Sequence, residues 1–448
     1  MATPQTSRAP CFRFEGECRS RSVSYHRYRE PIPPLSDRFC YRTWSPDIIL
    51  DHMRIRDITA TTLRFEYPSG REFDFAGGRC NARVSTLVRV YTDSDHVGLG
   101  SVYSHPDIVR TIVEDQLRPM LVGEDPADVE RLWRRCYSVT RWYGRKGAAV
   151  SALGGIDMAL WDLRGKAAGL PIYQLLGARR HRVPAYASAL LWKRDVAELR
   201  DEARRHLGRG FRGMKMRLGR NYAYDSAALR VVRETIGMEN RLMIEGNARY
   251  PFDQVKRLAP EFQAANIFWL EEPFLPEDPD GFRQLRPHLG AIPLAAGENE
   301  FGLQGFRELI DGHVVDIVQP DTCRCGGITE SLRVAGLAAQ HGLRVAPHTW
   351  SDAVALTANM HVLASLDNGV TVEVDQTGNP FIEELLTVPP RVENGEIAMP
   401  QGPGLGIALD ESAVERYSLP KGERIPDGNY SDMVFGLRFH APAPPYEA

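Results

Sequence analysis

The sequence lacks three features: long apolar runs, abundant cysteine and a strong net charge. It has no apolar run of roughly 18 residues, so we expect no membrane-spanning helix. The net charge of −3 gives no reason to expect nucleic acid or an anionic membrane as a partner. The seven cysteines are odd in number, and the spacing of Cys323 and Cys325 fits no common zinc motif. We therefore expect free thiols and a cytoplasmic location.

The first 52 residues differ in composition from the rest of the 448-residue chain. They contain eight arginines and six prolines but no lysine, and they show little apolar periodicity. The continuous apolar core of a signal peptide is also missing from them. We expect residues 1–52 to be a poorly ordered extension, or Met53 to be the natural start. A strand-like arm used in oligomer contacts is the alternative, and we expect a homo-oligomer.

Residues 53–180 show the pattern of a small α+β domain. Segments rich in β-branched residues predict strands at residues 55–65, 82–90 and 97–102. A glycine-rich loop is expected at residues 69–80. Apolar residues at helical spacing predict three helices, at residues 107–121, 126–143 and 147–168.

From residue 181 to 375, short apolar runs recur, and nearly all of them end in an ionisable residue. These residues are Lys215, Glu245, Glu271, Glu298, Asp321, His348 and Glu373. Their numbers differ by 23 to 30, which is the length of one strand, one helix and two loops. With residues 183–190 as a further strand at the start, eight strands result, and we expect an α/β fold with a TIM-like barrel. Barrel enzymes carry their chemistry at the C-terminal ends of the strands, so the seven side chains would meet at one mouth.

Three of these residues are carboxylates on successive strands: Glu245, Glu271 and Glu298. Oxygen ligands at this density suit a hard divalent cation, above all Mg²⁺. The alternative is three unrelated surface glutamates on loops. Glu272 adjoins Glu271 but points the other way along a strand, so we assign Glu271 as the ligand and Glu272 as an outer neighbour.

Two cations and an amide are expected near the metal. Lys215 and Arg217 are two residues apart and therefore share one face of their strand. On the barrel interior they would bind a substrate carboxylate, or one would act as a base; the alternative is an outward-pointing surface pair. Asn247, two residues after Glu245, would share its face and donate hydrogen bonds to the substrate.

Asp321 and His348 end neighbouring strands. A carboxylate on one imidazole nitrogen fixes the tautomer and leaves the other nitrogen free as an acid or base. The alternative is a structural histidine beside an unrelated aspartate. Glu373, on the eighth strand, completes the ring.

The motifs KxR, EGN, EEP, GEN, QPD, PHTW and VEVD, in this order, resemble those of the mandelate racemase subgroup of the enolase superfamily. The resemblance covers about residues 53–400 and implies a (β/α)7β barrel with an α+β capping domain. It implies Mg²⁺ on the three glutamates, and capping loops near residues 67–80 and 101–106 that select the substrate. By this resemblance, Lys215 and Arg217 occupy the positions of the family's lysine pair, and His348 and Asp321 those of its His–Asp dyad. Glu373 occupies the position of the acid that hydrogen-bonds the enediolate.

Two positions depart from the family pattern. The first metal ligand in this subgroup is most often aspartate, whereas here it is Glu245. The second lysine of the pair is usually the second base, whereas here it is Arg217, and arginine stays protonated in ordinary sites. Two-base chemistry is therefore disfavoured.

The resemblance implies that a proton α to a carboxylate is abstracted from a small-molecule substrate. We expect dehydration of a sugar acid or hydroxy-diacid to a 2-keto-3-deoxy acid. Racemisation or epimerisation is the second expectation, and cycloisomerisation is the third. A non-catalytic, metal-binding scaffold is the alternative from a different class of protein.

Residues 376–448 are rich in turn signals and too poor in apolar periodicity to fold alone. We expect them to pack on residues 53–180, to complete the capping domain and to help close the barrel mouth.

We predict that a chain beginning at Met53 keeps the specific activity of the full chain. Residues 1–52 have no helical or strand period, so they should contribute no catalytic group. The measurement compares turnover by the two chains after circular dichroism has shown that both are folded. A loss of more than tenfold in a normally folded short chain would show that the extension shapes the site or the assembly.

Overall fold

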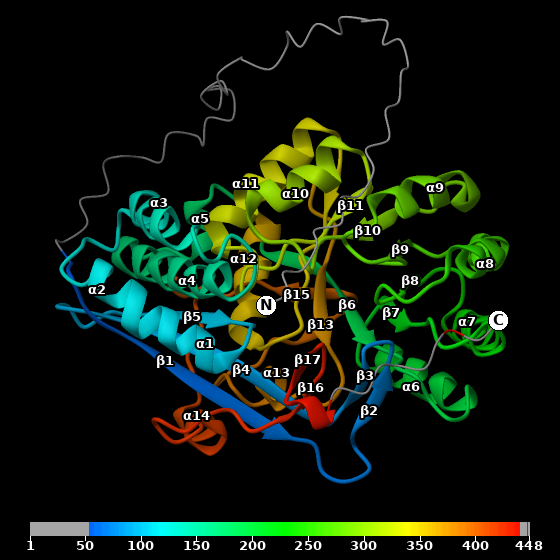
Figure 1. Cartoon of the computed structure of the whole chain (residues 1–448), viewed down its shortest axis with the longest axis horizontal. Coiled ribbons are helices and arrows are strands. Elements are labelled where there is room, and N and C mark those ends of the chain that lie inside the picture. Colours follow the sequence, from blue (N-terminus) through cyan, green and yellow to red (C-terminus); the bar gives the residue numbers. More distant parts are fainter. Residues whose placement is uncertain (1–52, 179, 440–445, 447–448) are drawn as a thin grey trace, which may run out of the picture. The chain divides into compact units, whose positions relative to one another are not determined.

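The computed structural model describes residues 53–178, 180–439 and 446. The expectations for residues 1–52 lie outside this range. The described chain forms a capping α+β domain, a barrel of parallel strands surrounded by helices, and a C-terminal tail that contacts both (Figure 1).

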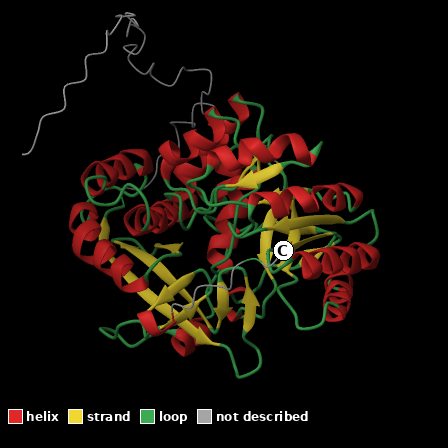
Figure 2. Ribbon diagram, turned by 45° about the vertical axis from the view of Figure 1, so that its right-hand side comes forward, coloured by secondary structure: helices red, strands yellow, loops and turns green. Residues whose placement is uncertain are grey.

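The capping domain is built on the expected three-stranded antiparallel sheet. Its strands are β1 (Ile55–Glu66), β4 (Ala82–Thr92) and β5 (Val97–Val102), with β4 in the middle. The expected helices lie on one side of this sheet (Figure 2). They are α1 (Pro106–Thr111), the π-helix η2 (Ile112–Leu117), α2 (Arg118–Leu121), α3 (Val129–Thr140) and α4 (Ala148–Ala168).

The glycine-rich segment at residues 69–80 is more ordered than a loop. It folds into a hairpin of β2 (Phe73–Phe75) and β3 (Gly78–Cys80). Phe73 and Phe75 alternate with Asp74, and both rings are buried. The alternation was too short to stand out beside the glycines, but burying the two rings stabilises the hairpin.

Helix α4 lies between the capping sheet and the barrel, which explains why its residues 149–163 are all buried. Two glycines let the helix and β5 approach closely: a Cβ on Gly100 of β5 would collide with the Gly155 carbonyl of α4, and a Cβ on Gly155 would collide with the side chain of Val102. On another side of the helix, the Asp157 carboxylate accepts hydrogen bonds from the backbone N–H (2.9 Å) and hydroxyl (2.5 Å) of Thr329 in the barrel. The helix therefore joins the two domains.

The eight expected barrel strands are present. They are β6 (Arg182–Ala189), β7 (Gly213–Arg217), β8 (Arg241–Glu245), β9 (Trp269–Glu271), β10 (Leu294–Ala296), β11 (Ile317–Val318), β12 (Arg344–Val345) and β13 (Val372–Asp375). Strands β6 to β12 pair in sequence order, all parallel, and β13 pairs with β6. Val345 of β12 exchanges backbone hydrogen bonds with Asn368 and Val370, just before β13. Strand β13 thus pairs with β6, and the segment just before it is hydrogen-bonded to β12, as in a barrel.

Helices follow the barrel strands and surround them (Figure 1). A short helix, α5 (Ile172–Leu175), precedes β6. The barrel helices are α6 (Ala197–Gly208), α7 (Tyr222–Ile236), α8 (Phe252–Ala264), α9 (Pro279–Leu289), α10 (Gly302–Asp311), α11 (Gly327–Gln340) and α12 (Ala353–Ala364). In the described part of the chain, no helix is both long and apolar enough to cross a membrane.

The C-terminal tail contacts the capping domain, as expected, and it also pairs with the first barrel strand, which we did not expect. Its elements are α13 (Pro380–Glu383), β14 (Val392–Glu393), β15 (Glu396–Ala398), α14 (Glu411–Tyr417), β16 (Gly428–Tyr430), β17 (Met433–Phe435) and η3 (Leu437–Phe439). Helix α14 contacts β1, and β16 contacts β4. In contrast, β15 pairs antiparallel with residues 182–184 of β6. Because β13 pairs with β6 only from Ala185 onward, those three residues need another backbone partner.

We predict that Gly100→Ala lowers the free energy of unfolding by about 1–3 kcal/mol, because the new methyl group would push β5 away from α4. Urea denaturation measures the change. Gly208→Ala, at the end of α6, is the control: its new Cβ has no atom within 4 Å, so stability should hold or rise slightly. Equal effects of the two substitutions would contradict the close contact.

Candidate active site

The structure brings the seven strand-end residues together at the C-terminal ends of the barrel strands. Lys215, Glu245, Glu271 and Glu373 lie within β7, β8, β9 and β13, and the other three follow their strands by two or three residues. All seven are buried: Lys215, Glu245, Glu271, Glu298, Asp321, His348 and Glu373. The alternatives of surface glutamates on loops and of an outward-pointing pair at Lys215 and Arg217 are therefore wrong.

Lys215 is the central cation of the site. Its Nζ atom lies 2.5 Å from Glu271 Oε1, 3.2 Å from Glu245 Oε2 and 3.0 Å from Glu373 Oε1. Burial acts to lower the pKa of Lys215, but the carboxylates of Glu271 and Glu373 outweigh it and raise the pKa well above its usual value. Burial likewise acts to raise the pKa of Glu373, and Lys215, His348 and Arg217 lower it to about 2. Lys215 is therefore charged, and so is Glu373 beside it.

Glu245, Glu271 and Glu298 form a carboxylate cluster that fits a hard divalent cation. One oxygen of each lies within 4.8 Å of the others, and all three side chains are buried. Among the described residues, Glu298 Oε2 has no hydrogen-bond donor. Burial, and then the neighbouring Glu245, raise the pKa of Glu271 to about 8. These observations mark a shortage of positive charge, and an oxygen-only donor set is what Mg²⁺ prefers.

Glu272 lies beside the cluster, outside the three-carboxylate set. Its backbone has a φ of 34°, and its side chain is buried. Asn299 Nδ2 donates a 2.8 Å hydrogen bond to Glu272 Oε2. Burial, and then the charges of Glu298 and Glu245, raise the pKa of Glu272 well above its usual range.

Arg217 is buried against an aromatic ring. Its guanidinium carbon lies 4.5 Å from the centre of the Trp350 ring, and that of Arg83, from β4 of the capping domain, lies 4.5 Å from the same centre. Burial acts to lower the pKa of Arg217, but Glu245 and Glu373 outweigh it and raise the pKa. The guanidinium therefore stays protonated.

His348 and Asp321 form the expected pair. His348 Nδ1 lies 2.8 Å from Asp321 Oδ2, and its Nε2 lies 3.4 Å from Glu298 Oε2 and 3.8 Å from Glu373 Oε2. Burial acts to lower the pKa of His348, but the charges of Glu298 and Glu373 and the contact with Asp321 raise it to about 9. Nε2 is thus the nitrogen that faces Glu298 and Glu373, whereas Nδ1 faces Asp321.

Asn359 on α12 supports this dyad, and the sequence analysis missed it. Its Nδ2 atom donates to Asp321 Oδ1 (3.3 Å), to the His348 carbonyl (2.7 Å) and to Thr349 Oγ1 (2.9 Å). The sequence shows only an amide within the mostly apolar stretch AVALTANM, and nothing in it places that amide beside Asp321.

Asn247 does not occupy the strand position we expected. Strand β8 ends at Glu245, and Asn247 adopts a φ of 44°, so the alternation of strand faces no longer applies to it. Its backbone N–H donates a 2.9 Å hydrogen bond to Glu245 Oε1. Its side-chain Oδ1 is buried with no donor among the described residues. Asn247 therefore orients Glu245 through its backbone.

Both expected capping loops contact loops at the barrel mouth. In residues 67–80, the Asp74 carbonyl accepts a 3.1 Å hydrogen bond from the N–H of Trp192, which follows β6. In residues 101–106, the Tyr103 N–H donates a 3.2 Å hydrogen bond to the carbonyl of Cys323, which follows β11. Both segments are thus hydrogen-bonded to loops that follow barrel strands.

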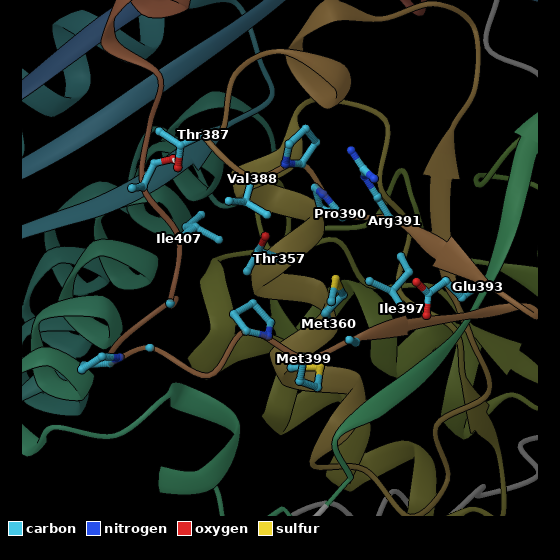
Figure 3. A pocket seen from close by; sticks show the side chains of 17 residues that line it. Thr357, Met360, Thr387, Val388, Pro390, Arg391, Glu393, Ile397, Met399 and Ile407 are labelled. Carbon is cyan, nitrogen blue, oxygen red and sulfur yellow. Dashed lines mark hydrogen bonds between the residues drawn. The ribbon is translucent and has the colours of Figure 1, made fainter. Parts of the chain in front are cut away.

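A separate cavity of about 590 Å³ lies between α12 and the tail (Figure 3). Its lining includes Thr357, Met360, Val388 and Met399. None of the seven strand-end residues lines it. The cavity is therefore distinct from the carboxylate cluster and its histidine.

Comparison with known proteins places the chain in a family. Residues 59–177 match the mandelate racemase / muconate lactonizing enzyme N-terminal domain, and residues 198–413 match the enolase C-terminal domain-like family. The D-galactarolactone cycloisomerase of Agrobacterium fabrum is 34% identical, over 81% of this chain and 99% of its own length. The arabinonate dehydratase of Saccharolobus solfataricus is 31% identical, over 73% of this chain and 89% of its own.

A solved structure agrees with this assignment. The structure of a racemase from Streptomyces coelicolor A3(2) with bound magnesium matches with a TM-score of 0.76 and 28% identity. The match covers 82% of this chain and 100% of the racemase chain. Together with the barrel, its capping domain and the ring of strand-end residues, these matches show that the chain belongs to the mandelate racemase subgroup of the enolase superfamily.

Proposed function

We propose that this member of the enolase superfamily is a Mg²⁺-dependent lyase. It dehydrates a sugar acid or hydroxy-diacid to a 2-keto-3-deoxy acid. The observation that carries the proposal is that the site has one imidazole able to exchange protons, at His348, whereas the second position holds a buried, protonated guanidinium at Arg217. Dehydration needs one base and an acid for the departing hydroxyl, whereas racemisation needs a base on each face of the carbon.

The residues divide the work as follows. Bound by Glu245, Glu271 and Glu298, Mg²⁺ would supply Lewis-acid stabilisation of negative charge on the substrate carboxylate. Lys215, in contact with two of these glutamates, adds a fixed positive charge that holds the same carboxylate.

The proton transfers fall to the dyad. Asp321 accepts the Nδ1 proton of His348. A cation on Glu298 would offset the charge that does most to raise the pKa of His348, so Nε2 could take the α-proton and return one to the departing hydroxyl. The α-proton and the β-hydroxyl leave together as water, and the resulting enol becomes the 2-keto acid. Arg217 binds the substrate and takes no proton, because its guanidinium has no free lone pair.

A cycloisomerase is the second candidate, because the D-galactarolactone cycloisomerase matches over most of both chains. The deciding experiment incubates the protein with open-chain sugar acids and with sugar-acid lactones, with and without Mg²⁺. Formation of 2-keto-3-deoxy acids from the open-chain acids supports the lyase. Consumption of a lactone without that product supports the cycloisomerase. Mg²⁺ binding without turnover or α-proton exchange supports a non-catalytic scaffold.

We predict that Glu298→Gln weakens Mg²⁺ binding at least tenfold and abolishes turnover, because one of three anionic ligands is lost. Calorimetric titration with Mg²⁺ gives the affinity, and far-UV circular dichroism should stay unchanged. The matched control is Glu300→Gln, a buried glutamate two residues away that pairs with Lys146. An unchanged affinity in Glu298→Gln would contradict the metal site.

We predict that His348→Asn stops exchange of the substrate α-proton with D₂O, whereas Arg217→Lys keeps part of it. Asparagine retains a polar side chain but cannot exchange a proton near neutral pH. Proton NMR follows the exchange. The assignment is wrong if His348→Asn exchanges at the wild-type rate and Arg217→Met does not, since the proton would then leave on the Arg217 side.

A further inference from the structure

The turn of the C-terminal hairpin reaches the active site. Strands β16 and β17 pair antiparallel from Gly428–Phe435 to Tyr430–Met433, which leaves Ser431 and Asp432 as the two turn residues. Ser431 is 1% exposed and has a φ of 69°, a backbone conformation that is unfavourable for residues other than glycine. A serine that is buried in a strained turn suggests that its hydroxyl group makes a contact that stabilises this conformation.

Ser431 holds the ring that packs on Arg217. Trp350 Nε1 donates a 2.6 Å hydrogen bond to Ser431 Oγ. The Trp350 ring is buried and lies against the guanidinium groups of Arg83 and Arg217. The indole N–H is the only polar group of this side chain, so the hydrogen bond fixes the orientation of the ring against Arg217.

Asp432 is connected to the carboxylate cluster through two other side chains. Asp432 Oδ2 accepts a 3.0 Å hydrogen bond from Arg324 Nη1, and Oδ1 accepts one from the Tyr103 hydroxyl of the capping domain. Arg324 Nη2 donates a 3.1 Å hydrogen bond to Asn299 Oδ1, whose Nδ2 donates to Glu272 Oε2. Glu272 is the buried acid beside the proposed metal ligands.

We propose that the Ser431–Asp432 turn is a positioning element of the active site. Its hydroxyl sets Trp350 against Arg217, and its carboxylate sets Arg324 and Asn299 against Glu272. One turn of the tail thereby adjusts both the Arg217 side and the metal side of the site. The inference rests on the proposed function, because it assigns the effects to substrate and metal binding.

The first part of the proposal, that Ser431 orients Trp350, is tested with Ser431→Gly. Glycine relieves the positive φ and removes the hydroxyl, so the melting temperature should stay close to wild type while Trp350 loses its acceptor. We expect the indole N–H of Trp350, assigned in NMR spectra with Trp350→Phe, to shift and to exchange at least tenfold faster with solvent. We expect KM for the acid to rise several-fold, with a smaller change in kcat. Unchanged indole exchange and unchanged KM would overturn this part of the proposal.

The second part of the proposal, that Asp432 positions the metal side of the site, is tested with Asp432→Asn. The substitution keeps the size of the side chain and removes the charge that holds Arg324. We therefore expect Mg²⁺ affinity, measured by calorimetry, to fall about three- to tenfold, since residues that hold metal ligands in place affect metal affinity. Asp427→Asn, an exposed acid just before β16, removes the same charge and should leave the affinity at wild type. If the two variants bind Mg²⁺ alike, this part of the proposal is wrong.

A double variant tests whether Asp432 acts through Arg324. With Arg324→Met in place, Asp432→Asn should cause no further loss of Mg²⁺ affinity. An equal additional loss in that background would overturn the connection. If the double variant does not fold, the single variants still decide.

Failure of the proposed function would look different. A wild-type protein that binds no Mg²⁺ and converts no sugar acid would refute the lyase, whereas the indole measurement on Ser431→Gly needs neither ligand.

Discussion

The structure depends on placing a group of charges in the interior of the barrel mouth, where opposite charges and hydrogen bonds must stabilise each of them. Moving charged groups out of water costs free energy that opposite charges and hydrogen bonds must offset. Lys215 contacts three carboxylates, yet burial and then the charge of Glu245 still raise the pKa of Glu271 to about 8. A divalent cation is the natural complement of these carboxylates. Parallel strands make the arrangement possible because each brings its last side chain to the same edge.

Further buried polar contacts join the capping domain to the barrel. Asp352, which caps α12, also accepts hydrogen bonds from the hydroxyls of Ser85 and Ser101 on the capping sheet. Arg83 of β4 pairs with Asp375 at the end of β13. Such contacts join the two domains through polar groups that would be costly to bury without a partner. Separating the domains would leave these groups exposed or without their hydrogen-bond partners.

The sequence was sufficient for the architecture and for the ring, because both follow from local signals. Apolar runs spaced 23 to 30 residues apart give the strands, and the residue ending each run gives the site. Contacts between distant segments leave no such signal. The pairing of β15 with β6, the support of Asp321 by Asn359, and the packing of Arg83 and Arg217 on Trp350 each depend on residues far apart in the chain. The position of Asn247 was misjudged because the strand ended two residues before it.

The packing of Arg83 limits which hairpins could replace β2–β3 in this sheet. The β2–β3 hairpin joins β1 to β4, and Arg83 lies just beyond it, opposite Phe65 in the sheet register. A transplanted hairpin of another length is tolerated only if that register survives, since a slip of one residue would turn Arg83 to the other face of the sheet. Trp350 and Asp375 would then lose their shared partner. A graft of this hairpin would therefore have to end before Ala82 and keep the pairing of β1 with β4 beyond it.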